Sequence, residues 1–405
     1  MTWLSSEPPA IDVGPGVTIG KVLLATPVDP QSNGIGALFL RDLVASQADT
    51  NFAFHQEPSF LTGGRAISSP SLVRFLWAGS SRLPLFHSAK LRWFRSWQLE
   101  TRTAAVTAAA DAAQAESIWT TASSPEMIWI AERLAASGRD VRVTVWDAPE
   151  YLSGNLRLDA ALCDILMESF ASLLQRARAV SVIGQAMQDD YRQRYGIRSE
   201  IIRHGIDADL TMVGRKPNSK GPVRVIFAGS LYSKKEWNSF VEALEAANWQ
   251  VAGRPVVLHF MGRFPLSDAR KPAQVVMLGE KPFGEALRIM SSMDIGYLPY
   301  WFDKSHETVA RTSFPGKLSA YAAAGLAVFH HAPSYTEATA FLQEYEFGLA
   351  CPSLKPDDVI GTLNRLVELA AMEECRAARM KAVHNELSRE AMAGRFRRFL
   401  GISPV

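Results

Sequence analysis

This chain of 405 residues contains few cysteines and carries little net charge. Its three cysteines, Cys163, Cys351 and Cys375, lie far apart and form neither a CxxC pair nor a Cys/His cluster. This spacing predicts reduced thiols and offers no zinc site. The formal net charge is only +2. A dedicated nucleic-acid binder carries a large basic excess, so we expect no nucleic-acid partner.

Long apolar runs are also missing. The longest stretch of small apolar residues, 319–329, is far shorter than the ~20 residues that a membrane-spanning helix needs. The N-terminal segment has neither a basic region nor a continuous apolar run, and its proline and glycine content predicts a flexible leader over residues 1–19. These absences lead us to expect a cytoplasmic protein.

What the chain does have is an ordinary globular balance, with 47% hydrophobic and 21% charged residues. Its length predicts two domains, because single hydrophobic cores rarely grow to this size. Short apolar runs alternate with helical patterns in the first half, and these runs are 21–27, 117–121, 141–146 and 179–184. Strands that alternate with helices predict right-handed crossovers and a parallel sheet.

The same pattern restarts after a polar, basic segment at 211–222, which is rich in glycine and proline and is typical of an interdomain linker. The apolar runs of the second half are 223–229, 256–262, 275–279, 294–300 and 326–332. The sequence therefore predicts an α/β protein with two Rossmann-like domains that face each other across a cleft at the carboxyl ends of their strands. We expect these domains over 20–205 and 206–385, and a final helix over 386–405 that packs back on the first domain.

One segment, 312–335, carries the clearest chemical pattern. Pro315 suits the start of a helix, and Gly316 lets a ligand approach the backbone. Lys317 then lies at a helix N-terminus, where free N–H groups already favour an anion. A lysine there suits a diphosphate, because its charge offsets the charge of a departing phosphate group. The alternative is an ordinary surface lysine on an amphipathic helix, and the residues alone leave the two interpretations about even.

The order of residues in this segment resembles a known element. Retaining glycosyltransferases of the GT-B fold, especially family four, commonly have F-P-S-K-L-x-E-Y-x-A-x-G at their donor site. The matching residues here are Phe314, Pro315, Lys317, Leu318, Tyr321, Ala323 and Gly325. Segments 203–207, 223–231 and 293–300 are similar to the family's hinge motif, its first donor-domain strand and the strand before the donor site. The resemblance covers most of the chain.

The chain also departs from the family pattern. Thr312 and Ala320 stand where many members carry two glutamates, the second of which contacts the donor ribose. Ser230 replaces the arginine that often follows the glycine equivalent to Gly229, whereas Lys235 keeps the position of a second phosphate-binding lysine. The resemblance implies that Lys317 and Lys235 balance a diphosphate. Ribose recognition then falls to Thr312, Ser313 and the main chain, or else the donor site is degenerate and inactive.

Two loops of the first half offer further candidates. Gly34 and Gly36 start a helix after the first strand, which brings a ligand close to backbone N–H groups. The loop resembles the family's glycine loop near the donor phosphates, although a plain tight turn explains it nearly as well. Asp147 and Glu150 follow the predicted strand 141–146. They resemble the family's acidic loop at the reaction centre, but Asp147 would equally suit a helix N-cap.

Three weaker assignments complete the candidate site. His331, which follows His330, has a place near the nucleotide or sugar, although a histidine there is more often structural. Glu280 lies in a loop that, in the family, borders the nucleobase. Residues 73–102 interleave arginine and lysine with tryptophan and phenylalanine, a pattern that indicates a peripheral membrane contact, an acceptor channel, or a core helix with solvated arginines.

Together the resemblance implies a retaining transferase that uses a UDP- or GDP-linked sugar and needs neither a metal nor a further cofactor. Its acceptor would be a hydroxyl of a glycan, a lipid-linked molecule or a small molecule, as in polysaccharide or glycoconjugate biosynthesis. Two alternatives remain open. One is a sugar-nucleotide epimerase of the same fold, and the other is a catalytically silent partner subunit.

Overall fold

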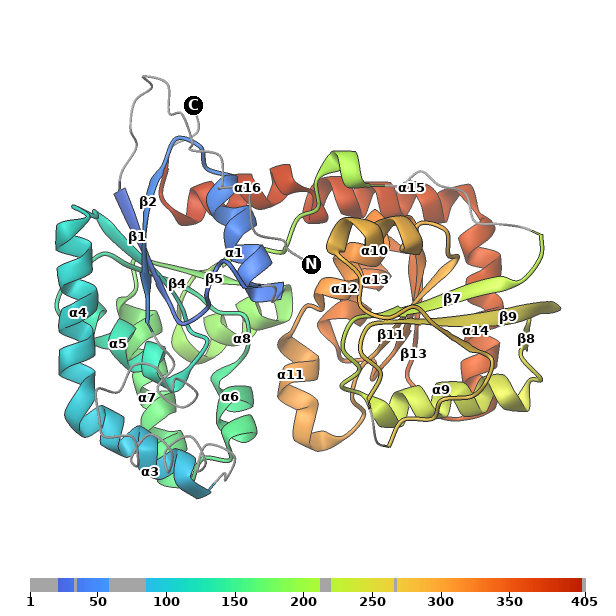
Figure 1. Cartoon of the computed structure of the whole chain (residues 1–405), viewed down its shortest axis with the longest axis horizontal. Helices are drawn as coiled ribbons and strands as arrows, with labels where there is room; N and C mark the ends of the chain where they lie inside the picture. Colours follow the sequence, from blue (N-terminus) through green and yellow to red (C-terminus); the bar gives the residue numbers. More distant parts are fainter. Residues whose placement is uncertain (1–20, 33–34, 58–84, 212–219, 266–267, 403–405) are drawn as a thin grey trace, which may run out of the picture. The chain divides into compact units, whose positions relative to one another are not determined.

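The computed structural model describes residues 21–32, 35–57, 85–211, 220–265 and 268–402 (Figure 1). The predicted leader 1–19, Gly34 and most of the linker lie outside these residues. The chain divides into two compact units. The first comprises residues up to Ser181, Arg192–Glu200 and residues from Arg395 onward, and the second comprises Val182–Tyr191 and Ile201–Gly394.

The first unit is built on a parallel sheet with the strand order β2-β1-β3-β4-β5-β6. These strands are β1 (Lys21–Thr26), β2 (Asn51–Gln56), β3 (Ser117–Thr121), β4 (Val141–Thr144), β5 (Ala179–Val182) and β6 (Glu200–Ile201). Every residue of β3 is buried, as expected of a central strand covered on both faces. The edge strand β2 alternates exposed and half-buried residues, which is why its polar sequence NFAFHQ gave no clear apolar run.

Helices and one π-helical turn complete the first unit. They are α1 (Ile35–Ala45), α3 (Leu85–Trp93), η1 (Phe94–Gln98), α4 (Leu99–Ala112), α5 (Pro125–Ala136), α6 (Pro149–Leu156), α7 (Ala160–Arg176) and α8 (Gln185–Tyr195), whose first residues belong to the second unit. The N-cap Ser124 accepts a hydrogen bond from Met127 N, and Pro125 follows at the first helical position, so local sequence fixes the start of α5.

The second unit contains a larger sheet with the parallel order β10-β9-β7-β11-β12-β13, and β8 pairs antiparallel with β9. Its strands are β7 (Val223–Ala228), β8 (Gln250–Val251), β9 (Arg254–Met261), β10 (Val275–Met277), β11 (Ile295–Pro299), β12 (Ala327–His331) and β13 (Gly348–Cys351). The central strands β11 and β12 are wholly buried. Both units therefore have the parallel α/β architecture that the sequence predicted.

Helices cover both faces of this second sheet. Figure 1 shows α9 and α14 on one side and α10, α12 and α13 on the other. The bounds are η2 (Ala208–Leu210), α9 (Lys234–Ala246), α10 (Phe283–Met290), η3 (Lys304–His306), α11 (Glu307–Thr312), α12 (Gly316–Ala323), α13 (Glu337–Tyr345), α14 (Pro356–Ala371) and α15 (Glu373–Ala382). The small residues Ala322, Ala323 and Ala324 are fully buried, so α12 packs closely on the sheet.

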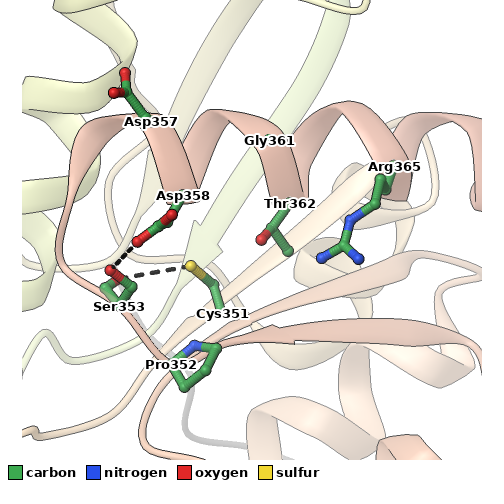
Figure 2. Close-up of a pocket in the computed structure, with 8 residues that line it drawn as sticks. All are labelled: Cys351, Pro352, Ser353, Asp357, Asp358, Gly361, Thr362 and Arg365. Atoms are coloured by element: carbon green, nitrogen blue, oxygen red, sulfur yellow. Dashed lines mark hydrogen bonds between the residues drawn. The ribbon is translucent and has the colours of Figure 1, made fainter.

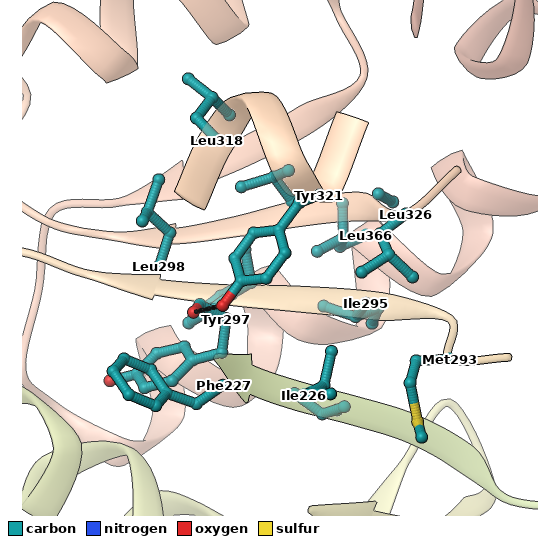
Figure 3. Packing of buried hydrophobic residues seen from close by; sticks show 14 of the residues in the cluster. Ile226, Phe227, Met293, Ile295, Tyr297, Leu298, Leu318, Tyr321, Leu326 and Leu366 are labelled. Atoms are coloured by element: carbon teal, nitrogen blue, oxygen red, sulfur yellow. Dashed lines mark hydrogen bonds between the residues drawn. The ribbon is translucent and has the colours of Figure 1, made fainter. Parts of the chain in front are cut away.

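A continuous apolar core fills the space between the sheet and α12. Figure 3 shows Phe227, Tyr297 and Tyr321 lying among aliphatic side chains of this core. The Tyr321 hydroxyl donates to Tyr297 O at 3.1 Å and accepts from Ala228 N at 3.0 Å, so a buried polar group ties α12 to both β7 and β11. Gly296 leaves room for this ring, since a Cβ there would lie 2.5 Å from Tyr321 Cδ2. The start of α12 is thus held in a fixed place by the core.

The C-terminal segment continues from α15 through η4 (Val383–Leu387) into α16 (Arg389–Phe399). Ile206 and Ser388 form an isolated parallel bridge, and Gly205 is required there because a Cβ would lie 2.3 Å from Ser388 O. In the first unit, Phe396 packs on Trp119 at 4.7 Å between ring centroids, and Arg142 Nη1 donates to Phe399 O at 2.8 Å. Phe396 and Phe399 thereby become part of the core of the first unit.

Among the described residues, none of the helices combines the length and the apolar character needed to cross a bilayer.

Candidate functional site

Lys317 lies in the first turn of α12 in the second unit. Its Nζ donates to Ser230 O at 3.2 Å and lies 5.4 Å and 5.5 Å from the ring centroids of Phe227 and Tyr232. Desolvation by these surroundings lowers the pKa of Lys317 to about 8. No carboxylate within the described residues forms an ion pair with it. Lys317 is therefore a desolvated cation without a counter-charge, which favours binding of an external anion.

A glycine loop at the carboxyl end of β7 lies against this amine. Gly229 has φ +97°, and a Cβ there would lie 3.2 Å from Lys317 Cε. Gly262, at the end of β9, would place a Cβ 2.5 Å from Gly229 O. Both positions favour glycine, because each has a positive φ, and a side chain would meet Lys317 at the first position and the backbone of Gly229 at the second. The structure thus brings the predicted residues Gly229, Ser230 and Lys317 together at the carboxyl edge of the sheet, where parallel α/β sheets bind ligands.

The second predicted lysine, Lys235, occupies the first turn of α9. Its side chain is exposed, and it pairs with no carboxylate in the part of the chain that the structure describes, whereas Lys234 lies 3.7 Å from Asp268. A surface depression of about 470 Å³ is lined by Lys234, Lys235, Asn238, Ser239, Glu242, Asp268 and Leu354. Lys317 does not line it, so each lysine has its own surroundings within the second unit.

The predicted residues before Lys317 are bonded within the protein. Thr312 Oγ1 donates to Thr308 O at 2.8 Å, and Ser313 Oγ donates to Val309 O. Ser313 Oγ also lies 3.3 Å from the Tyr300 hydroxyl.

The next residues lead into α12. Phe314 is buried, and the guanidinium of Arg203 lies 4.6 Å from the centroid of its ring. Pro315 is the N-cap residue, Gly316 is exposed at the first helical position, and Leu318 is in the core.

Two other assignments have distinct surroundings. His331 is fully buried, with Nε2 2.8 Å from Ser353 O and Nδ1 3.1 Å from the Tyr297 hydroxyl. Desolvation lowers its pKa to about 4, and the adjacent His330 behaves alike, so both rings are neutral at pH 7. A ligand would have to displace a partner of His331. Glu280 is exposed and lies 3.8 Å from Arg263.

In the first unit, Gly36 is the second residue of α1 and lies beside Trp146. A Cβ at Gly36 would lie 3.1 Å from Trp146 Cζ3, and Phe39 stacks on the same indole with centroids 5.9 Å apart. The predicted glycine loop and the predicted acidic loop therefore meet at the carboxyl edge of this sheet. The remaining member of the glycine pair, Gly34, lies outside the described residues.

The two candidate carboxylates of this loop differ. Asp147 is half-buried, has no ion pair or hydrogen bond among the described residues, and has its pKa raised by desolvation. Glu150, in the first turn of α6, lies 2.7 Å from Arg194 Nη2 and is thereby neutralised. The acidic group available for an external ligand is consequently Asp147.

The basic and aromatic stretch 73–102 is described from Leu85 onward. It forms α3, η1 and the start of α4, and Leu91, Phe94 and Leu99 point into the core. Phe86, Trp93 and Trp97 are exposed by 47%, 41% and 72%. Arg92 forms a bidentate salt bridge with Asp159, so part of the positive charge of this stretch is already paired.

Sequence reasoning missed Tyr232, whose ring lies beside Lys317, and Trp301, whose ring lies beside that of Tyr232. Tyr232 lies between β7 and α9 and is 65% exposed, and Trp301 follows β11, with its ring centroid 6.3 Å from that of Tyr232. The available signal was their position: each stands a few residues after the carboxyl end of a central strand.

Another depression, of about 490 Å³, lies at the start of α14 (Figure 2). Ser353 Oγ donates to Asp358 Oδ2 at 2.6 Å, and burial raises the pKa of the Cys351 thiol, which is therefore uncharged at pH 7. None of the predicted site residues lines it. The described residues also contain no cluster of three or more His, Cys, Asp or Glu side chains suited to a metal ion.

Neither a protein-family model nor a curated protein matches the sequence. Solved structures do match over nearly the whole chain. Sucrose-phosphate synthase from Thermosynechococcus elongatus gives a TM-score of 0.63 at 14% identity, covering 95% of this chain and 99% of that one. A UDP-forming α,α-trehalose-phosphate synthase from Burkholderia xenovorans, in complex with glucose-6-phosphate, gives 0.61 at 13%, covering 94% and 100%. HepE from Anabaena, in complex with UDP and glucose, gives 0.58 at 13%, covering 95% and 100%.

These structural neighbours are GT-B glycosyltransferases with two Rossmann-like domains. At 13–14% identity, a likeness of this kind establishes architecture and leaves activity to be argued from the site. The two parallel sheets described above agree with it. The resemblance that the sequence suggested is thus confirmed at the level of the fold: this chain has the GT-B fold.

Proposed function

We propose that the protein is a retaining glycosyltransferase that moves a sugar from a nucleotide-diphosphate sugar, UDP- or GDP-linked, to a hydroxyl acceptor. The observation that carries this proposal is the unpaired, desolvated amine of Lys317 beside the Gly229 loop. A half-buried, desolvated cation without a counter-ion is unfavourable, and a bound diphosphate would supply the missing negative charge. One of the structural neighbours, HepE, was solved in complex with UDP and glucose, which is consistent with this class of donor.

In the proposed reaction, the bond between the sugar's anomeric carbon and the phosphate oxygen breaks, and a bond to the acceptor oxygen forms on the same face. Lys317 offsets the charge that develops on the departing diphosphate, which is the kind of electrostatic stabilisation that contributes most in enzymes. The acceptor hydroxyl passes its proton to the departing phosphate oxygen. Such a reaction requires no strong general base and no metal, and Asp147 would bind an acceptor or sugar hydroxyl through its free carboxylate.

Calorimetry with UDP and GDP tests the central assignment. We expect one of the two to bind the wild-type chain and Lys317→Met to lose that binding, because methionine keeps the side-chain volume without the charge. Lys271→Met is a matched control, since Lys271 also has its amine near an aromatic ring, 5.8 Å from the centroid of Phe264, but lies outside the glycine loop. If neither nucleotide binds the wild-type protein, the interpretation as a silent partner subunit is favoured.

Incubation with donor in the absence of acceptor separates transfer from epimerisation. A transferase leaves the sugar nucleotide almost intact, whereas an epimerase converts it without a second substrate. The observation that favours transfer is the absence of a paired acid and base near Lys317, because an epimerase that moves a ring proton needs such groups. This absence refers to the described residues around α12.

We also propose that the exposed aromatic side chains of α3 and η1 contact a membrane interface, which would suit a lipid-linked acceptor. Phe86, Trp93 and Trp97 are large apolar groups on a surface that also carries arginine, a combination that favours anionic lipid headgroups. Co-sedimentation with vesicles of anionic and neutral phospholipid tests this contact. Trp97→Ser would reduce anionic-vesicle binding, and equal recovery of both proteins would contradict it.

A further inference from the structure

The surface beside Lys317 holds two aromatic side chains that no role described so far requires. Tyr232 is 65% exposed although it is a large ring, and Trp301 is half-buried. Their ring centroids lie 6.3 Å apart at an interplanar angle of 35°, and the amine of Lys317 lies 5.5 Å from the Tyr232 centroid. Exposed aromatic rings that adjoin an unpaired cation are typical of a ligand site.

Two hydrogen bonds hold these rings in place. Ser233 Oγ, next to Tyr232, donates to Pro299 O at 3.1 Å. Phe302 N, next to Trp301, donates to Glu236 Oε1 at 2.9 Å. Ser233 and Glu236 are therefore joined to the chain on either side of Trp301, which fixes the backbone that carries the two rings. A ring on a fixed backbone loses little entropy when a ligand stacks on it.

The hydrogen bond between Phe302 N and Glu236 requires the burial of a carboxyl group, which is unfavourable, so we infer that this bond has a function. The side chain is buried, and desolvation raises the pKa of Glu236 despite the bond from Phe302 N. On the other side, Trp301 stacks on His306 with centroids 4.7 Å apart and an interplanar angle of 11°. His306 Nδ1 in turn lies 2.7 Å from Asp303 Oδ1. Trp301 is thus oriented from two directions.

We propose that Tyr232 and Trp301 form a wall that stacks on the sugar ring of the donor. This inference rests on the proposed function, because it takes the diphosphate to lie at Lys317. A sugar is attached directly to the phosphate that departs, whereas a nucleobase is separated from the other phosphate by a whole ribose. A ring only 5.5 Å from the charged amine is within reach of the group directly attached to the phosphate.

Two positions of the predicted donor site leave room for such a wall. Thr312 and Ala320 supply no carboxylate, and the hydroxyl of Thr312 is bonded to Thr308 O. These positions therefore offer a donor neither a carboxylate nor a free hydroxyl. Stacking on the apolar face of a sugar ring provides affinity without a carboxylate.

The test compares binding of UDP with that of UDP-glucose, or of GDP with that of GDP-mannose if GDP is the nucleotide that binds. For Tyr232→Leu and Trp301→Leu we expect the sugar nucleotide to bind roughly tenfold more weakly, while the nucleoside diphosphate binds as tightly as to wild type. Tyr232→Phe and Trp301→Phe keep a ring and should retain most of the affinity. Phe54→Leu is the control for an exposed aromatic elsewhere, since Phe54 is 48% exposed in β2, and thermal unfolding checks that each variant is folded.

The possible outcomes distinguish the sugar wall from the diphosphate site at Lys317. If both ligands weaken equally in the leucine variants, the rings contact the base or the phosphates, and the sugar wall is wrong. If neither ligand is affected, the wall is wrong while the diphosphate site at Lys317 stands. If wild type binds neither UDP nor GDP, the proposed function fails, and the wall fails with it.

Discussion

Each unit has a candidate site with one desolvated charged group. This group is a cation in the second unit and an acid in the first. Lys317 is a cation whose pKa burial lowers to about 8, and no carboxylate among the described residues neutralises it. Asp147 is an acid whose pKa burial raises, and it forms no ion pair with a cation in the same part of the chain. Each lies at the carboxyl edge of a parallel sheet, where backbone geometry leaves room for a ligand.

Other charged groups of the molecule are neutralised by a side chain of opposite charge. Arg203 is buried at 6% exposure, yet it bonds to Glu337 at 2.9 Å and to Glu386. Glu150 lies only three residues from Asp147 and is paired with Arg194. Within the described residues, Arg203 and Glu150 are thus neutralised, whereas Lys317 and Asp147 have no counter-charge. A desolvated charge without a counter-charge is a reason to propose a functional site.

The largest expected effect concerns the cationic site. Lys317→Ala should reduce turnover of the sugar nucleotide about 10³-fold. A positive group placed beside a developing negative charge typically accelerates a reaction by about this factor. Steady-state kinetics of kcat/KM measures this, with Lys271→Ala as control. Turnover within a factor of about three of wild type would show that the unpaired amine has no part in the reaction.

The acidic site should respond differently. Asp147→Asn should lower kcat about 10²-fold, as is common for a carboxylate that binds a reacting hydroxyl, while leaving nucleotide affinity unchanged. Because burial raises the pKa of Asp147, the acid limb of the rate profile should lie above the ordinary range of an aspartate. Glu150→Gln is the matched control, and a larger loss there than at Asp147 would reverse the assignment.

The pH dependence distinguishes the two signs of charge. Lys317 carries its proton below pH 8 and loses it as the pH rises, so kcat/KM should fall above about pH 8, by up to about tenfold per pH unit. Lys317→Arg keeps its proton at all these values and should abolish this alkaline limb, although its larger head group lowers the rate. An unchanged limb in the arginine variant would assign it to another group.

The smallest effect concerns stability. The pKa of Lys317 is lower in the folded than in the unfolded chain, so its burial as a cation costs free energy, fully below pH 8 and progressively less up to about pH 10.5. Lys317→Met should therefore raise the free energy of unfolding by about 1–3 kcal/mol at pH 7. Chemical denaturation at pH 7 and pH 10 measures this gain, which should shrink at the higher pH. A destabilised variant would indicate that Lys317 is structural.

Much of the fold could be predicted from local pattern. The strand 117–121 was predicted with its observed bounds, and 223–229 and 326–332 each match an observed strand within a residue at either end. These strands are buried on both faces, so their apolar runs are continuous. The edge strand β2 was missed because one exposed face removes half of that signal.

The candidate site was less predictable. The sequence brought Gly229, Ser230 and Lys317 into one hypothesis through motif order, and the structure places these three together. It could not distinguish Asp147 from Glu150, because the partner Arg194 lies more than 40 residues away in sequence. Tyr232 and Trp301 were missed for the same reason: they are nearly 70 residues apart and come together only when β7 and β11 pair.

By itself the sequence determined two parallel α/β units and a lysine at the start of a helix, since periodicity, glycine and proline act within a few residues of chain. Tertiary structure decided which charges remain unpaired and which rings adjoin them. Desolvation and counter-charges depend on groups that are distant in sequence, and only the packed sheets bring those groups within a few ångströms of one another.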